Sequence, residues 1–282
     1  MKQLSNIIIA IKGAGEMASA IAWRLYMANL RHIFMMEVSH PLAVRRQVSF
    51  CEAIYEKNNT VEGVTAAAVS HPDDVHEAWE KGWIAVLTDP HWNALHDLAP
   101  DVCVDAILAK KNLGTTMADA HTVIGIGPGF FAGKDVHMVV ESNRGHHLGR
   151  IISSGSAEPN TGIPGEISGY AKERVLRSPA DGCFETYTSI GDLVKQGDDI
   201  GHVGKSLVRS QISGVVRGLI RTGTIVQKGL KLGDIDPRGD IAHCPTISDK
   251  ARAVSGSVLE AILRVFLVPT DKHPDPENLA LI

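Results

Sequence analysis

The chain has 282 residues, enough for about two domains of roughly 150 residues each, so a single small module held together by disulfides or a metal is excluded. Its 28 basic and 32 acidic side chains give a net charge of -4, which argues against general binding to nucleic acid or to an anionic membrane surface. The four cysteines are widely separated, and no apolar run is long enough to cross a bilayer, so we expect a cytoplasmic protein with reduced thiols.

The first half of the chain predicts alternating strands and helices. A β-branched run over residues 6–12 leads into the turn Gly13-Ala14-Gly15, and apolar residues then recur at helical spacing. Apolar runs also predict strands over 33–38, 83–88, 102–107 and 121–126, and a helix-like stretch covers 41–55. Because such runs are typical of buried parallel strands, we expect a Rossmann-like parallel sheet.

The first turn matches the pattern G-x-G-x-x-A, which is typical of a nucleotide site. Gly13 allows the tight turn, Gly15 allows a ligand to approach the backbone, and Ala18 allows close packing of helix on strand. Amides at the helix start would bind a phosphate or pyrophosphate, although the carboxylate of Glu16 would repel a diphosphate. Glu37, at the end of the second strand, would accept hydrogen bonds from a ribose diol. The residues assigned to this cofactor site are Gly13, Gly15, Glu16, Met17, Ala18, Glu37 and Arg45.

A central glycine-rich segment carries the densest polar chemistry. The glycines that follow the strand over 121–126 would permit an amide nest for an anion. Strand alternation over residues 135–141 would place acidic and imidazole side chains on one face, and these could hold an anion, a substrate or a metal. No zinc spacing such as H-E-x-x-H is present, so no metal site is assigned. The candidate ligand contacts here are Gly127, Gly129, Asp135, His137, Glu141, Arg144 and His146.

The second half contains an internal repeat with an offset of 32 residues, which pairs Gly182 with Gly214 and Gly201 with Gly233. This pattern resembles the biotinyl/lipoyl barrel-sandwich hybrid, in which the acceptor lysine lies on a hairpin that Lys205 would occupy here. Lys205 is flanked by glycine and serine rather than by methionines, so no covalent biotin or lipoate is expected. Helical periodicity over 248–266 predicts a helix that packs back on another domain.

The predicted fold is therefore α/β, with a Rossmann-like parallel-sheet domain, a mostly-β barrel-sandwich-hybrid-like domain and a C-terminal helix. The expected parts are residues 1–126 as the Rossmann-like domain, 127–172 as a segment that completes the cleft, 173–240 as the duplicated barrel-sandwich domain, and 241–282 as the C-terminal helix and tail.

The order of motifs along the chain resembles the YqeB family, the accessory proteins of the selenium-dependent molybdenum hydroxylase system. The motifs are Gly13 to Ala18, Pro41 to Arg46, Asp105 to Asn112, Gly125 to Gly129 with Ala132 to Asp135, Glu141 to Gly149, and Asp236 to Arg238. The first half is also similar in kind to molybdenum-cofactor maturation factors of the XdhC type. The resemblance implies maturation of a molybdenum hydroxylase, with that enzyme as the client partner and a molybdopterin-type ligand or a dinucleotide as the bound cofactor.

Two other functions stay open from the residues alone. The glycine turn with Glu37 also fits an NAD-dependent oxidoreductase, and the duplicated half fits a non-catalytic scaffold that docks the client enzyme. No nucleophile and base are visibly coupled in the sequence, so the chain is not assigned as an enzyme, and homo-oligomer formation is left open. Cys51 and Cys103 could carry sulfur or selenium, but we expect both to be core residues.

Overall fold

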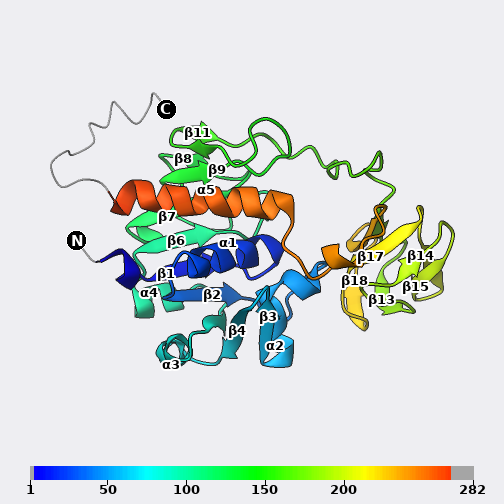
Figure 1. Cartoon of the computed structure of the whole chain (residues 1–282), viewed down its shortest axis with the longest axis horizontal. Helices are drawn as coiled ribbons and strands as arrows, with labels where there is room; N and C mark the ends of the chain where they lie inside the picture. The colour runs from blue at the N-terminus through cyan, green and yellow to red at the C-terminus, as the bar shows by residue number, and fades with distance from the viewer. Residues whose placement is uncertain (1–2, 268–282) are drawn as a thin grey trace. The chain divides into compact units, whose positions relative to one another are not determined.

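The computed structural model describes residues 3–267 and divides the chain into two compact units (Figure 1). Of the described residues, unit 1 contains 3–41, 49–160 and 247–267, and unit 2 contains 42–48 and 161–246. The units are thus interleaved along the chain, whereas the four parts expected from the sequence are consecutive. None of the helices in residues 3–267 combines the length and apolar character needed to cross a bilayer.

Unit 1 is built on one sheet of nine strands. In sheet order these strands are β10 (Ile151–Ile152), β9 (Met138–Val140), β7 (Thr122–Ile126), β6 (Val102–Asp105), β1 (Ile9–Lys12), β2 (Ile33–Glu37), β5 (Ile84–Thr88), β4 (Val64–Val69) and β3 (Asn58–Val61). Neighbours from β9 to β4 run parallel, whereas β10 and β3 are antiparallel to their neighbours at the two edges. The predicted unit of strand, glycine turn and helix at the start of the chain is confirmed.

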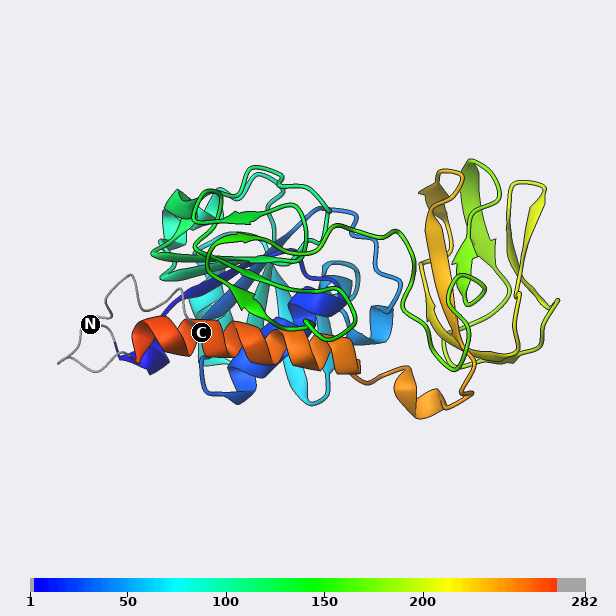
Figure 2. The same ribbon diagram turned by 90° about the horizontal axis from the view of Figure 1, so that it is seen from above.

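The helices of unit 1 cover this sheet. They are α1 (Glu16–Met27), α2 (Ala53–Glu56), α3 (Asp74–Glu80), α4 (Ala94–Leu98) and α5 (Asp249–Phe266), with 3-10 helices η1 (Leu4–Asn6), η3 (Phe50–Glu52) and η4 (Met117–Asp119), and a small ribbon of β8 (Phe131–Ala132) with β11 (Gly155–Ser156). Helix α5 lies along α1, on the same side of the sheet (Figures 1 and 2). Val75 of α3 and Ala94 of α4 pack with Ala10 and Phe34 in one buried cluster. The helix predicted over 248–266 is therefore confirmed, as is its packing against another part of the chain.

Unit 2 contains two antiparallel sheets of four strands each. One sheet has the order β12 (Val175–Arg177), β19 (Lys231–Asp236), β17 (Gly214–Leu219) and β14 (Leu193–Val194), and the other has β16 (Ser206–Arg209), β15 (Asp199–Val203), β13 (Gly182–Thr186) and β18 (Thr224–Val226). The short 3-10 helices η2 (Arg46–Val48) and η5 (Ile241–His243) also belong to this unit. Its core contains Phe184, Ile200, Val216 and Leu232.

The internal repeat predicted at an offset of 32 residues is confirmed by the strand positions. Adding 32 to the residue numbers of β12, β13, β14 and β15 gives positions within β16, β17, β18 and β19, respectively. The repeated glycines have a steric role, because a Cβ at Gly201 would lie 2.2 Å from the carbonyl oxygen of Glu185 and a Cβ at Gly233 would lie 2.8 Å from that of Gly218. Close approach of neighbouring strands therefore requires glycine in both copies.

The fold class predicted from the sequence is wrong. The main sheet is mixed rather than parallel, because β3 and β4 form a hairpin through Glu62 and Gly63, both with positive φ, and β10 folds back on β9. Two separate antiparallel sheets form unit 2 instead of a barrel-sandwich hybrid.

The helix predicted over 41–55 is also wrong. Residues 42–48 belong to unit 2, and only the turn η3 and the four-residue helix α2 follow in unit 1. A close contact explains why this segment is not one continuous helix, because a Cβ at Gly218 would lie 2.8 Å from the carbonyl oxygen of Val44. Tertiary packing on β17 thus overrides the local helical pattern.

Candidate functional site at the carboxyl edge of the sheet

The parallel strands of unit 1 bring several loops to one edge of the sheet. Strand β1 lies between β2 on one side and β6 on the other, so the direction of strand order reverses beside it. In open sheets of this kind, ligands bind outside the carboxyl ends of the strands at such a reversal. The loops at this edge follow β1, β6, β7 and β9, and they contain most of the polar residues selected from the sequence.

The loop after β1 is shaped by its two glycines. Gly13 has a φ of +89°, and a Cβ there would lie 3.3 Å from the Cα of Ile107, so this loop contacts the loop after β6. Gly15 precedes α1 with a φ of -72°, and a Cβ built on it would meet nothing within 4 Å. Met17 and Ala18 are buried in the first turn of the helix. The backbone at Gly15 is therefore open to an approaching group, while the rest of the turn is packed.

Glu37 and Glu16 each contact this loop region through their carboxylates. The amide of Ala14 donates to Oε2 of Glu37 at 2.9 Å, and the amide of Val38 donates to Oε1 at 2.9 Å. Burial raises the pKa of Glu37, and these two amide bonds partly oppose the rise. The hydroxyl of Ser248 donates to Oε1 of Glu16 at 3.0 Å, so the start of α5 is joined to the start of α1.

Three cationic side chains, Lys110, Arg144 and Lys250, form what we call the basic cluster. Burial lowers the pKa of Lys250, and the neighbouring charges of Lys110 and Arg144 lower it further, against the opposing effect of Glu16 and Glu141. Lys110 has a positive φ of 65° in the loop after β6, a conformation that persists only where the surrounding structure holds it. These cations come from the loop after β6, the loop after β9 and the first turn of α5. Their mutual repulsion would be relieved by a bound anion.

Asp249 balances part of this charge. Its two carboxylate oxygens accept from the two terminal nitrogens of Arg144 at 2.7 and 2.8 Å. The Arg144 side chain is about one-third exposed in this pair. The bidentate geometry fixes the guanidinium at the start of α5, where the helix dipole also favours negative charge.

Other residues selected from the sequence shape the loops of this edge. A Cβ at Gly129 would lie 2.8 Å from the backbone of Lys111, and one at Gly127 would lie 2.3 Å from the hydroxyl of Ser142. The buried carboxylate of Glu141 accepts from the backbone amides of residues 143 and 158 at 2.6 and 2.7 Å. We infer that Gly127, Gly129 and Glu141 hold the loops in place.

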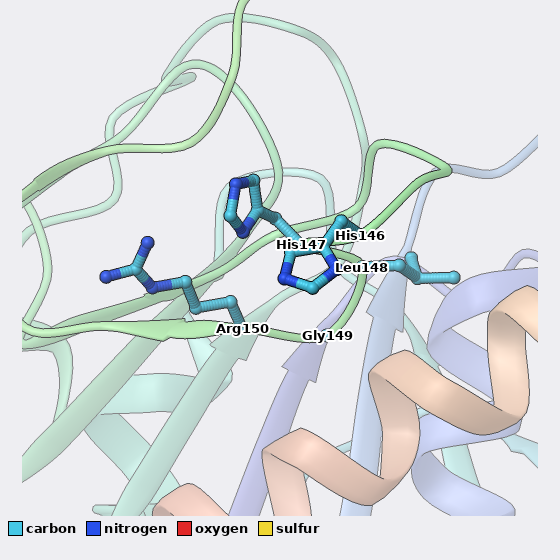
Figure 3. Close-up of a pocket in the computed structure, with 5 residues that line it drawn as sticks. All are labelled: His146, His147, Leu148, Gly149 and Arg150. Atoms are coloured by element: carbon cyan, nitrogen blue, oxygen red, sulfur yellow. The ribbon is translucent and has the colours of Figure 1, made fainter. Parts of the chain in front are cut away.

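His146 lies farther along the loop after β9. With residues 147–150 it lines a shallow hollow of about 540 Å³ (Figure 3). Its ring centroid lies 5.1 Å from that of His147, in an edge-on arrangement. The hollow is open to solvent and presents imidazole groups together with Arg150.

Three of the selected residues are not brought to this edge. His137 directly precedes β9, at its amino end, and its Nδ1 accepts from the amide of Val123 at 3.0 Å. Burial and the charge of His121 lower the pKa of His137. The carboxylate of Asp135 accepts from the amide of Phe131, 2.9 Å away. Arg45 belongs to unit 2, where its guanidinium donates to backbone carbonyls of residues 243, 244 and 246.

The sequence analysis missed a buried network, the Lys12 cluster, which consists of Lys12, Asp105, Thr115 and Asp119. Lys12 is 1% exposed and donates to the hydroxyl of Thr115 at 2.8 Å and to the carboxylate of Asp119 at 2.6 Å. Thr115 in turn donates to Asp105 at 2.6 Å. Burial raises the pKa of Asp105, and the bond from Thr115 opposes that rise. The sequence signal that could have indicated this network is a charged residue, Lys12 or Asp105, at the end of each of two predicted strands.

The thiols of unit 1 are buried. Cys51 is 1% exposed and Cys103 is fully buried, which confirms that both are core residues. Burial raises the pKa of the Cys103 thiol to about 12, so the thiolate needed for sulfur chemistry is scarce at neutral pH. Within residues 3–267, no group of three or more His, Cys, Asp or Glu side chains is arranged to hold a metal ion.

Comparison with known proteins gives one strong sequence similarity. No family model matches the chain. A curated protein of Escherichia coli K12, described as uncharacterized protein YqeB, is 46% identical over 259 residues, which cover 92% of this chain. The chain spans about half of that relative, 48% of its length.

Solved structures give only weak similarities. An aspartoacylase family protein from Mesorhizobium loti is 14% identical, with 81% of this chain and 84% of that chain covered and a TM-score of 0.27. A succinylglutamate desuccinylase/aspartoacylase from Rhodobacter sphaeroides is 11% identical, with 81% and 85% covered and a TM-score of 0.26.

Proposed function

Because the chain is a homologue of YqeB, we propose that it is a cytoplasmic accessory protein that helps to mature selenium-dependent molybdenum hydroxylases. In this proposal it binds a phosphate-bearing cofactor, a molybdopterin species or a nucleotide, at the carboxyl edge of the sheet in unit 1. The hydroxylase that receives the cofactor is the proposed partner.

The observation that carries the binding proposal is the basic cluster beside the glycine loop. Arg144 donates two hydrogen bonds to Asp249, the residue before Lys250, and Gly15 leaves the nearby backbone open. The charges of Lys110 and Arg144 act on Lys250 in the same direction as its burial, which lowers the pKa of Lys250. A phosphate bound here would neutralise crowded cations and accept hydrogen bonds from main-chain amides at the start of α1. In the ligand-free protein the carboxylate of Glu37 accepts a hydrogen bond from the Ala14 amide. A bound phosphate would therefore use neighbouring amides or displace this carboxylate.

The binding test compares two Gly→Ala variants. In Gly15→Ala the new methyl group enters open space with an ordinary backbone φ of -72°, so folding is preserved while the methyl blocks a ligand at this backbone. We expect about tenfold weaker binding, equivalent to about 1.4 kcal/mol. The control is Gly256→Ala in α5, where a Cβ also meets nothing within 4 Å.

Titration calorimetry with ADP, NAD and a molybdopterin dinucleotide provides the measurement. The proposal predicts binding of at least one of these ligands, loss of affinity in Gly15→Ala and unchanged affinity in Gly256→Ala. Absence of heat with all three ligands, or equal affinity in the two variants, would overturn the site. Capture of a molybdenum hydroxylase by the full chain, strengthened by the bound ligand, tests the partner separately.

A further inference from the structure

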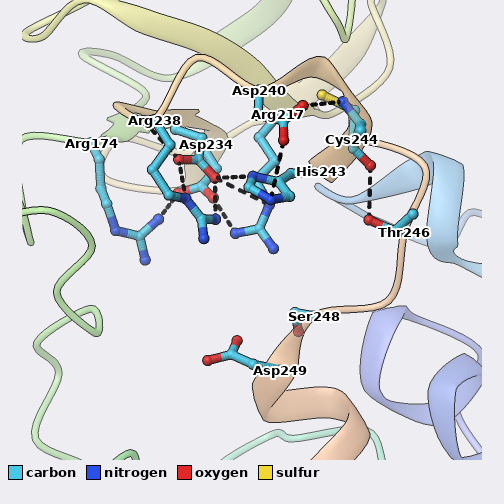
Figure 4. Close-up of polar contacts among 12 residues, drawn as sticks. Arg174, Arg217, Asp234, Arg238, Asp240, His243, Cys244, Thr246, Ser248 and Asp249 are labelled. Atoms are coloured by element: carbon cyan, nitrogen blue, oxygen red, sulfur yellow. Dashed lines mark hydrogen bonds and ion pairs between the residues drawn. The ribbon is translucent and has the colours of Figure 1, made fainter.

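Unit 2 contains a second set of buried charges that the proposed function does not use. Arg174, Arg217 and Arg238 lie close to the carboxylate of Asp234 in Figure 4. Arg217 and Arg238 also lie within 4 Å of the carboxylate of Asp236. Three guanidinium groups thus share these two carboxylates. His243 borders the same set, with its Nδ1 3.9 Å from Asp236 and its Nε2 3.5 Å from Asp240.

Both carboxylates of this set are already held by other arginines. Arg238 donates to the two oxygens of Asp236 at 2.9 and 2.6 Å, and Arg174 donates to Asp234. Arg217 lies farther from each carboxylate than the arginine that donates to that carboxylate. Its Nε is 3.7 Å from Asp236 and its Nη1 is 3.8 Å from Asp234. Neither separation is a hydrogen bond.

Arg217 therefore has a buried donor without a hydrogen-bond partner. The residue is 8% exposed, and its Nε is fully buried with no acceptor among residues 3–267. The Nδ1 of His243 is likewise buried without a hydrogen-bond partner among the described residues. Buried polar groups are almost always satisfied, and an unsatisfied one calls for an explanation such as a bound ion. The side chains of Arg238 and His243 are 41% and 35% exposed, so the set is open to solvent on their side.

The strand geometry directs Arg217 into this set. In the pairing of β17 with β19, Val216 lies opposite Ile235 and Gly218 lies opposite Asp234, which leaves Arg217 as the extra residue of a β-bulge. Bulges re-aim side chains and are frequent beside functional sites.

The other copy of the repeat lacks this arrangement. The positions equivalent to Arg217 and Asp234 are Glu185 and His202, which lie directly opposite each other without a bulge. Their side chains form a pair at 3.2 Å, in which the Glu185 side chain is 59% exposed. The repeat therefore folds without a buried arginine at this position, and the bulge in the second copy is an addition to the common scaffold.

We propose that unit 2 binds a phosphate-type oxyanion at Arg217, with Arg174, Arg238 and His243 as neighbouring donors. A tetrahedral dianion fits better than a carboxylate, because it offers acceptors in several directions to guanidinium groups that arrive from separate strands and turns. The site is separate from the one under Proposed function, since all of its residues belong to unit 2.

The test uses the full chain with inorganic phosphate and, in a second arm, glycerol 3-phosphate, to distinguish the free anion from a phosphomonoester. Titration calorimetry compares the wild type with Arg217→Leu, Arg209→Leu and Gly15→Ala. Arg209 is the matched control, because it lies in the same unit but its side chain is 60% exposed in a pair with Asp199. The Nε–H resonance of Arg217, identified by its loss in Arg217→Leu, reports directly on the guanidinium.

We expect phosphate to shift the Arg217 Nε–H resonance, and Arg217→Leu to weaken binding by about tenfold or more. Arg209→Leu should bind as the wild type does, and in Gly15→Ala phosphate should still shift the Arg217 Nε–H resonance. The proposal is overturned if the resonance does not move with either probe, or if Arg209→Leu weakens binding as much as Arg217→Leu does. Loss of phosphate binding in Gly15→Ala alone would assign the anion to unit 1 and also overturn it.

Discussion

Two buried cations, Lys12 in unit 1 and Arg217 in unit 2, occupy similar positions in their units but have opposite surroundings. Each lies on a strand and beside aspartates, with 1% and 8% of its surface exposed, respectively. Lys12 donates two short hydrogen bonds, to Thr115 and Asp119. The buried Nε of Arg217 has no hydrogen-bond partner among the described residues, and its aspartates accept from Arg174 and Arg238.

The difference indicates two roles for buried charge. A fully bonded network rigidifies the site that contains it, and its loss leaves uncompensated charge in the interior. A cation without hydrogen bonds costs stability in the ligand-free protein and gains its partners when an anion binds. The Lys12 cluster therefore supports the loops of the carboxyl edge, and Arg217 is suited to hold a ligand.

The largest expected effect comes from breaking the bonded network. Lys12→Met removes the cation that pairs with Asp119 and donates to the hydroxyl of Thr115, while Asp119 keeps its hydrogen bonds from Thr116. Removal of one partner from a buried ion pair typically costs about 3–5 kcal/mol. Urea denaturation followed by circular dichroism would measure this loss in the free energy of unfolding.

The control for that experiment is an exposed lysine in the same unit. Lys81 directly follows α3 and pairs with Glu77 at 2.6 Å, with the two side chains 49% and 67% exposed. Lys81→Met should cost less than about 0.5 kcal/mol, since exposed helical pairs contribute little. A Lys12→Met variant no less stable than Lys81→Met would show that the buried network does not support unit 1.

An intermediate effect is expected at Asp236 in unit 2. Burial acts to raise the pKa of Asp236, but hydrogen bonds from the side chain and backbone of Arg238, together with the charges of Arg238 and Arg217, outweigh it and hold this pKa below its usual value. Because the folded-state pKa is depressed, the stabilisation is present above the unfolded-state value of about 4 and disappears as the pH falls through the folded-state pKa. Asp236→Asn should therefore cost about 1–3 kcal/mol at pH 7.

The pH dependence distinguishes this electrostatic role from a packing role. The difference in unfolding free energy between wild type and Asp236→Asn should shrink as the pH is lowered below about 4. Asp199, whose side chain is 44% exposed in its pair with Arg209, supplies the control variant Asp199→Asn, for which the difference should be small. A cost at Asp236 that stays constant from pH 7 to pH 3 would contradict the assignment.

The elements predicted from the sequence were those with a strong local signal. The glycines predicted the turn between β1 and α1, and the helical period predicted α5. The repeated glycines predicted the duplication, because the space at Gly201 and Gly233 admits no side chain larger than hydrogen. The hairpin of β3 and β4 was missed because its residues are largely polar or alanine. Without this hairpin the predicted main sheet contained only parallel strands. An apolar run indicates a strand but does not show which strands lie beside it in the sheet.

The sites were harder to predict for a different reason. Gly13, Gly15 and Glu37 meet around Ala14, as a local motif allows. Lys12 and Asp119 are 107 residues apart, and Arg174 and Asp234 are 60 apart, so only the tertiary fold brings them together. A one-residue bulge in β17 directs the side chain of Arg217 toward the aspartates. The sequence of a strand alone does not show which register the strand adopts.

The smallest expected effect is at Arg217 itself. If this arginine donates no hydrogen bond in the ligand-free protein, Arg217→Leu removes a desolvated cation while both aspartates keep their main partners. The loss of two long charge contacts is then offset because the desolvation cost of the guanidinium disappears, so the free energy of unfolding should change by less than about 1 kcal/mol.

Arg174 is the comparison for this prediction. It is equally buried, at 8% exposure, but donates to Asp234 and to the carbonyl of Gly165. Arg174→Leu should therefore cost about 1.5–3 kcal/mol, and thermal denaturation in phosphate-free buffer would compare the two. An Arg217→Leu variant as unstable as Arg174→Leu would mean that Arg217 stabilises the ligand-free fold, and the contrast with Lys12 would no longer hold.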